Sequence, residues 1–170
     1  AELIASAQAP HNALATEIAH AAGLRAHELL TLCPVAERAA DPRPALDSKW
    51  KGRSGEIYTV QGKGGLTREV MIPHELAARL EERRLDAPQV VTDRGVFYQS
   101  SYDIGGGQRW SNSVSAASER TMGRSTGAHG LRHSYAQERM TELQNRGLSR
   151  DAALETVSQE MGHFRPEITE

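Results

Sequence analysis

Apolar residues recur at helical spacing along most of the chain, and this pattern predicts a mostly helical protein. The first such stretch runs from Ala13 to Leu32, with a break before it at Pro10 and a weak point at Gly23. A second follows Pro73, and a third runs from near Trp110 to about Met122. We therefore expect at least three amphipathic helices in the first three quarters of the chain.

The last quarter of the chain predicts two more helices, joined at a glycine. Leu131, Tyr135 and Leu143 share one helical face, and Gly147 follows them in the position of a helix C-cap. Ser149 then provides an N-cap, and Asp151 adds a negative charge in the first turn of the next helix. Apolar residues continue that helix at the expected spacing, namely Leu154, Val157 and Met161.

Strand patterns are confined to the middle of the chain. Ile57 to Val60 and Arg68 to Ile72 read as two strands around a turn at Gly62 to Gly65, which predicts a β-hairpin. Four apolar residues further on indicate a buried strand pair, namely Val90, Val91, Val96 and Phe97. Prolines 34, 42 and 44 predict a loop before the hairpin. The expected fold is α+β, mostly helical with a small antiparallel β-sheet, and all 170 residues form a single domain.

Composition limits the class of protein. The chain has one cysteine, Cys33, so an internal disulfide is impossible, and it has no run of about 18 apolar residues that would span a bilayer. The N-terminus lacks the order of regions found in a signal peptide. These features favour a cytoplasmic protein.

The formal net charge of −2 argues against a nucleic-acid binder, but the positive residues are unevenly distributed. Between Lys49 and Arg68 the chain carries five positive residues and one negative residue, Glu56, a local net charge of +4. We expect the DNA-binding residues to lie here, namely Lys49, Lys51, Arg53 and Arg68. The remaining basic residues are all arginine, which suits bidentate phosphate binding but is equally explained by genomic composition.

Four separated segments each carry a positive or polar group suited to an anionic oxygen. The first holds Arg25, with Glu28 three residues later, and the second is the hairpin turn with Lys63. The third is His129, Gly130, Leu131, Arg132, and the fourth is Met161, Gly162, His163. Each motif alone is common, but all four in this order are specific.

In this combination the chain resembles the catalytic domain of tyrosine recombinases, the phage-integrase family, from about Thr16 to its end. The resemblance implies site-specific DNA cleavage and rejoining through a 3′-phosphotyrosine intermediate. It implies that Arg25 and Arg132 bind the non-bridging phosphate oxygens and that Lys63 protonates the departing 5′-oxygen. It assigns hydrogen bonds to the phosphate or tyrosine to His129 and His163, with His129 the preferred proton acceptor. Glu28 is expected to orient a neighbouring arginine or histidine.

The resemblance also sets expectations about partners and extent. The substrate is double-stranded DNA, near the bacterial nucleoid. No metal is expected because the protein supplies the positive charge, and no other cofactor because the phosphotyrosine link conserves the energy of the broken bond. Full-length members act as tetramers on paired sites, whereas an isolated fragment is expected to be monomeric. The nucleophilic tyrosine is expected just beyond Glu170, so the chain reads as an inactive fragment that also lacks the family's N-terminal DNA-clasping domain.

Several alternatives stay open at this point. Arg25 and Glu28 are suitably spaced for a structural ion pair, and a glycine-rich turn with a lysine is often only a turn. A relative that binds DNA without cutting it would carry similar motifs. His129 and His133 have the spacing of zinc ligands in a metal-dependent hydrolase, but Gly130 stands where a zinc protease has its glutamate. Tyr135, Trp50 and Trp110 are expected to pack in the core.

Overall fold

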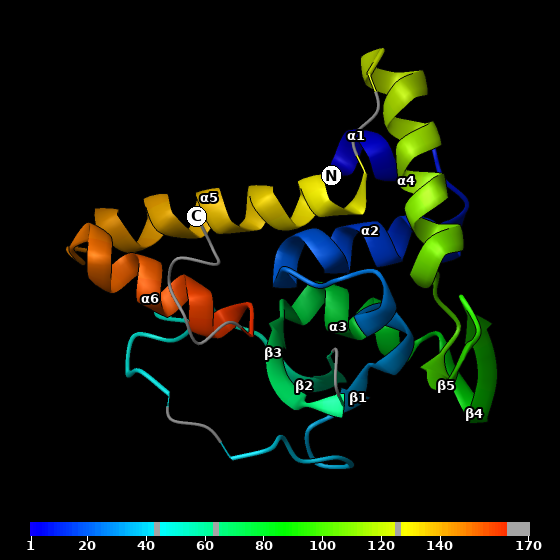
Figure 1. Ribbon diagram of the computed structural model, residues 1–170, viewed down its shortest axis with the longest axis horizontal. Helices are drawn as coiled ribbons and strands as arrows, with labels where there is room; N and C mark the ends of the chain where they lie inside the picture. Colours follow the sequence, from blue (N-terminus) through cyan, green and yellow to red (C-terminus); the bar gives the residue numbers. More distant parts are fainter. Residues whose placement is uncertain (43–44, 63–64, 125–126, 163–170) are drawn as a thin grey trace.

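A computed structural model of the protein describes residues 1–42, 45–62, 65–124 and 127–162. Within these ranges it contains six α-helices, a three-stranded antiparallel sheet and a two-stranded antiparallel ribbon. The predicted α+β class is therefore confirmed, with one more small sheet than expected. Figure 1 shows the three-stranded sheet in the middle of the molecule, a pair of helices at one end and the ribbon at the other.

The first helical stretch is not one helix. It is divided between α2 (Pro10–Ala22) and the 3₁₀ helix η1 (His27–Thr31), and a short helix, α1 (Glu2–Ala5), precedes it. Pro10 occupies the start of α2, where its missing N–H is harmless, and Gly23 ends that helix in the left-handed conformation with a φ of 70°. A side chain at position 23 would also lie 2.8 Å from the ring of Tyr135. Arg25 falls within the stretch predicted as helical, but it lies in the short link between α2 and η1.

The predicted hairpin is confirmed in the central sheet, which consists of β1 (Cys33–Pro34), β2 (Glu56–Gln61) and β3 (Thr67–Ile72) in that order. Val60 is paired with Arg68 in the antiparallel register of β2 and β3. The expected loop at Pro34 is wrong at that residue, because Pro34 pairs with Tyr58 in the short edge strand. An edge position tolerates proline, since one side of the strand needs no donor.

The second predicted strand pair is confirmed as strands, but the prediction that it is buried is wrong. β4 (Arg84–Asp93) and β5 (Val96–Tyr102) form a ribbon that follows α3 (His74–Glu81). Val90 and Phe97 are 60% and 75% exposed. The inner part of β5 is attached to the rest of the molecule, because the hydroxyl of buried Ser100 donates to the carbonyl of Leu30 in η1. Most of the ribbon therefore projects beyond the core.

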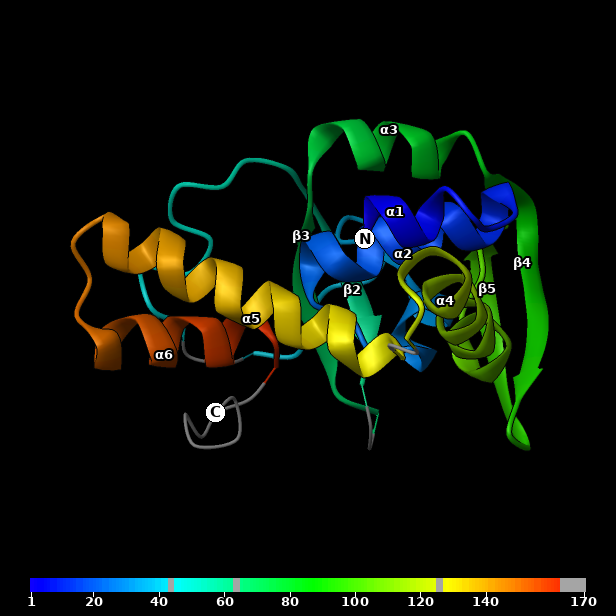
Figure 2. The ribbon, with the colours of Figure 1, turned by 90° about the horizontal axis from the view of Figure 1, so that it is seen from above.

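The last three helices are α4 (Gly107–Met122), α5 (Ala128–Asn145) and α6 (Arg150–Glu160). Figure 2 shows α5 and α6 lying side by side and running in opposite directions, with the start of α5 near α2. The Ser149 side chain caps α6 by accepting from the backbone N–H of Ala152, as predicted. Within the described ranges, no helix has both the length and the apolar character needed to cross a membrane.

The core confirms two of the three aromatic predictions. Trp110 of α4 is fully buried, and its indole N–H donates to the hydroxyl of Thr16 in α2 over 3.1 Å. Tyr135 of α5 is 2% exposed and packs in a second cluster with residues of α6. Trp50 is only partly buried and lies in the loop before β2. Trp110 thus joins α4 to α2, and Tyr135 joins α5 to the end of α2 and to α6.

Candidate functional site

The link after α2 brings Arg25 beside an acidic residue three positions later. The backbone N–H of Arg25 donates to Oε1 of Glu28 over 2.8 Å, so the Glu28 side chain holds the turn that leads into η1. The guanidinium of Arg25 lies 3.8 Å from Oε2 of Glu28, and its side chain is 37% exposed. Arg25 therefore reaches the surface from a tightly held backbone.

Glu28 is the centre of this site. Its side chain is completely buried, and Arg68 donates to it twice, from Nε over 3.1 Å and from Nη2 over 2.9 Å. Burial alone would raise the pKa of Glu28, but the charge and hydrogen bonds of Arg68, together with Arg25 and Arg132, keep that pKa below its ordinary value. Glu28 is thus an ionised carboxylate within a group of arginines, where it can orient them as expected.

Arg132 reaches the same carboxylate from α5. Its side chain is 6% exposed, and Nη1 lies 3.9 Å from Oε1 of Glu28. Two carbonyls accept hydrogen bonds from its guanidinium, that of Gly23 over 2.8 Å and that of Met161 over 2.9 Å. Burial lowers the pKa of Arg132 to about 9, and the charges of Arg25 and Arg68 act in the same direction. The carboxylate of Glu28 acts in the opposite direction, so burial is the main cause of the lowered pKa.

Arg68 does not occupy the position expected of a DNA contact. It is 8% exposed, and besides its two bonds to Glu28 it donates to the backbone carbonyl of Glu160 at the end of α6 over 2.9 Å. We therefore correct the prediction that Arg68 binds DNA directly. The strand pattern carried a signal for this: Arg68, Val70 and Ile72 alternate along β3, so Arg68 shares the buried face of the strand.

All four sequence motifs converge on Glu28 and Arg68. Gly62 immediately precedes Lys63, and a Cβ on it would lie 3.4 Å from Oε2 of Glu28. Gly162 immediately precedes His163, and a Cβ there would lie 2.6 Å from Cδ of Arg68. Lys63 and His163 themselves lie outside the described residues. The fold thus brings together segments that are widely separated in the sequence.

His129 lies at the edge of the site. It is exposed in the first turn of α5, three residues before Arg132, and residues at this spacing are neighbours on a helix. His133, one turn further along, is also exposed. No three potential metal ligands of the His, Cys, Asp or Glu type come together within the described ranges.

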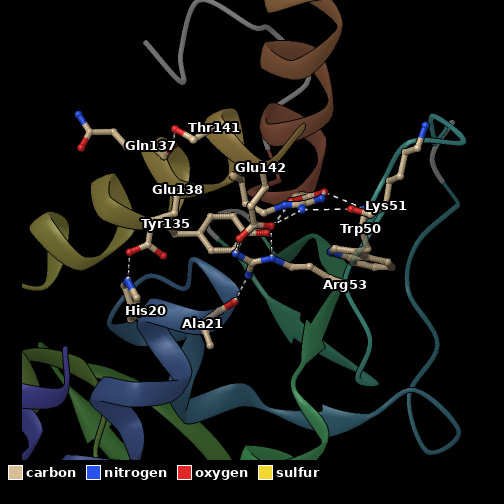
Figure 3. A network of polar contacts seen from close by, with 12 residues as sticks. His20, Ala21, Trp50, Lys51, Arg53, Tyr135, Gln137, Glu138, Thr141 and Glu142 are labelled. Atoms are coloured by element: carbon tan, nitrogen blue, oxygen red, sulfur yellow. Dashed lines mark hydrogen bonds and ion pairs between the residues drawn. The ribbon is translucent and has the colours of Figure 1, made fainter. Parts of the chain in front are cut away.

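The basic loop before β2 is only partly available for contact with DNA. Lys51 is exposed, whereas Lys49 is partly buried, with its ammonium 4.4 Å from the centre of the Trp50 ring. Figure 3 shows that Arg53 turns inward, where it donates to both carboxylate oxygens of Glu142 and to the carbonyl of Ala21. The predicted +4 stretch is therefore not one continuous exposed patch, because Arg53 and Arg68 are engaged inside the protein.

Sequence reasoning missed the residue that anchors this loop. Glu160 is fully buried at the end of α6, and its carboxylate accepts hydrogen bonds from two nitrogens of Arg139, from the hydroxyl of Tyr135 and from the backbone N–H of Trp50. Trp50 itself has a φ of 61°, a conformation that is rare for a residue with a bulky side chain. Only an indirect signal of this anchor is present in the sequence, because Tyr135 and Arg139 lie one turn apart on the same face of α5.

No protein-family model matches the chain, and no curated protein matches it either. The resemblance to tyrosine recombinases therefore rests on the four motifs alone. The structure adds the independent observation that these motifs meet in space.

Proposed function

We propose that this chain is the catalytic domain of a site-specific DNA recombinase of the tyrosine type and that the arginine group around Glu28 binds the phosphate at which the DNA is cut. The observation that carries the proposal is the convergence of the four motif segments on Glu28 and Arg68. A chance combination of common motifs has no reason to meet at one carboxylate.

The charge of the group fits an anionic ligand. Arg25, Arg68 and Arg132 contribute three positive charges and Glu28 one negative charge, which gives these four side chains a formal net charge of +2. A phosphodiester carries one negative charge and gains charge density on its non-bridging oxygens as a nucleophile attacks. Arginine suits this task, since its planar fork can donate two parallel hydrogen bonds to one phosphate.

In the proposed reaction a tyrosine oxygen attacks phosphorus in line, and the bond from phosphorus to the 5′-oxygen breaks. Lys63 gives a proton to the departing oxygen, and His129 accepts the proton of the tyrosine. Arg25 and Arg132 bind the non-bridging oxygens. Rejoining is the reverse reaction, with a 5′-hydroxyl attacking the phosphotyrosine bond.

The experiment uses covalent capture from random DNA, so that the target sequence emerges from the result. A version of the chain that continues through the expected tyrosine is mixed with a library of random DNA duplexes, the mixture is denatured, and the DNA attached to protein is counted and sequenced. We expect attached DNA to share a sequence. Arg132→Lys should lower its yield by at least about tenfold, because a point charge cannot replace the guanidinium fork.

Arg53→Lys is the matched control, because Arg53 also makes a two-pronged contact, to Glu142, but lies outside the arginine group. Its yield of attached DNA should stay within about threefold of the unchanged protein. An equal loss in the two variants would contradict the role of Arg132. DNA binding without any covalent product would instead support the alternative, a relative that binds DNA without cutting it.

A further inference from the structure

Arg68 has no counterpart among the four motifs, yet of the three arginines it lies closest to the carboxylate of Glu28. Two of its nitrogens meet the two oxygens of Glu28, and a third donates to the carbonyl of Glu160. Arg25 and Arg132 approach the same carboxylate only at 3.8 and 3.9 Å. The Glu28 carboxylate is therefore paired mainly with Arg68.

The position of Arg68 also links three of the four motif segments. It lies on β3, opposite Val60 of β2, so it is part of the hairpin whose turn includes Lys63. Its side chain packs against Gly162, which has a φ of 83° and no space for a Cβ. Through Glu28 it also contacts the link that carries Arg25.

We propose that Arg68 is a positioning residue: by holding Glu28, it limits how far that carboxylate neutralises the charges of Arg25 and Arg132. This inference rests on the proposed function. Without Arg68, the formal charge of the group falls from +2 to +1, and the buried carboxylate takes Arg25 and Arg132 as its partners. Both arginines are already close enough for small side-chain movements to bring them into direct contact with Glu28.

A double-mutant cycle of Arg68 and Glu28 tests the positioning role. Inorganic phosphate is the probe, and its Kd is obtained by NMR from the arginine Nε–H signals. Glu28→Gln should change Kd less in the unchanged background, where Arg68 holds this carboxylate, than in the Arg68→Met background. Arg68→Met should weaken phosphate binding at least tenfold. Adding Glu28→Gln to Arg68→Met should recover most of that loss, since the pair Arg25 and Arg132 again carries +2.

A merely structural role for Arg68 predicts no such recovery of affinity. Equal effects of Glu28→Gln in the two backgrounds would overturn the proposal, as would unchanged binding in Arg68→Met. If the unchanged chain binds no phosphate, the anion site of the proposed function is refuted, and the role of Arg68 within it is refuted too. Normal binding that is indifferent to Arg68 refutes the positioning role alone.

Arg68→Met leaves a buried carboxylate with weaker partners, so its folding is checked by thermal unfolding. If this variant does not fold, Arg68→Lys takes its place, because lysine keeps the charge but cannot hold both oxygens of Glu28. The expected weakening is then about threefold, again reversed by Glu28→Gln. Arg53→Met with Glu142→Gln is the control cycle, since this pair lies outside the arginine group, and it should show no coupling in phosphate affinity.

Discussion

The buried pair of Arg139 and Glu160 allows the clearest test of how the C-terminal helices are held together. Both side chains have no exposed surface, and their closest contact is 2.7 Å. Glu160→Gln keeps the shape of the side chain but removes its charge, and its amide NH₂ must face groups that are themselves donors. Breaking a buried pair by altering one partner costs about 3 to 5 kcal/mol of the free energy of unfolding.

For a chain of this length, each kcal/mol lowers Tm by about 2 to 4 °C, so Glu160→Gln should lower Tm by about 6 to 20 °C. Circular dichroism during heating measures this. Glu138→Gln is the control, because Glu138 pairs with His20 at the surface, where the Glu138 side chain is 53% exposed (Figure 3). Its effect should stay below about 0.5 kcal/mol.

Glu160→Gln should also release the loop before β2. The backbone N–H of Trp50 donates to Oε2 of Glu160 over 2.7 Å, and this bond helps to hold Trp50 at its φ of 61°. We expect the amide proton of Trp50 to exchange with solvent faster in Glu160→Gln than in Glu138→Gln. A fall in Tm below about 3 °C, or equal exchange rates in the two variants, would show that the pair does not anchor this loop.

Two further predictions concern the free energy of unfolding, one in acid at Glu142 and one at Gly162. Arg53, with Arg139, lowers the pKa of Glu142 from 4.5 to about 2, so its stabilisation is complete above pH 4.5 and is lost as the pH falls toward 2. Glu142→Gln should therefore lose about 1 kcal/mol in urea unfolding at pH 7, a value reduced for the partly exposed carboxylate, and the difference should shrink below pH 4. Gly162→Ala should destabilise the chain by about 1 kcal/mol more than Gly65→Ala. The two glycines share a φ of 83°, but only at Gly162 would the added methyl group meet Arg68.

The helices could be predicted well from the sequence because their signals are local. Ser149, Gly147 and Pro10 act within a turn of their own positions. Ser149 is the N-cap as expected, whereas Pro10, expected as a break before the helix, is its first residue. The break at Gly23 is different in kind. The left-handed backbone there is accompanied by close contact with the ring of Tyr135, more than one hundred residues further along, and no local pattern shows that contact.

The site shows the same division between local and distant information. Spacing predicted that Arg25 and Glu28 could form an ion pair, and the resemblance implied that Glu28 lies beside an arginine or histidine; in the structure Glu28 contacts three arginines. Residue type could not distinguish Arg68 from the exposed basic residues near it, because lysine and arginine are usually solvated. The alternation along β3 contained that distinction, but its meaning depends on knowing which face of the strand is covered.

Local charge explains how a chain with a net charge of −2 can still be proposed to bind DNA. Exposed charges more than about 10 Å apart are largely screened at ordinary salt concentrations, so the sum over the whole surface has little influence on one phosphate. The arginine group differs because Arg68 and Arg132 are buried and are screened much less. Under the proposed function, phosphate binding depends on the balance within the group, three guanidinium groups against one carboxylate, and Arg68 sets that balance because it holds the carboxylate most closely.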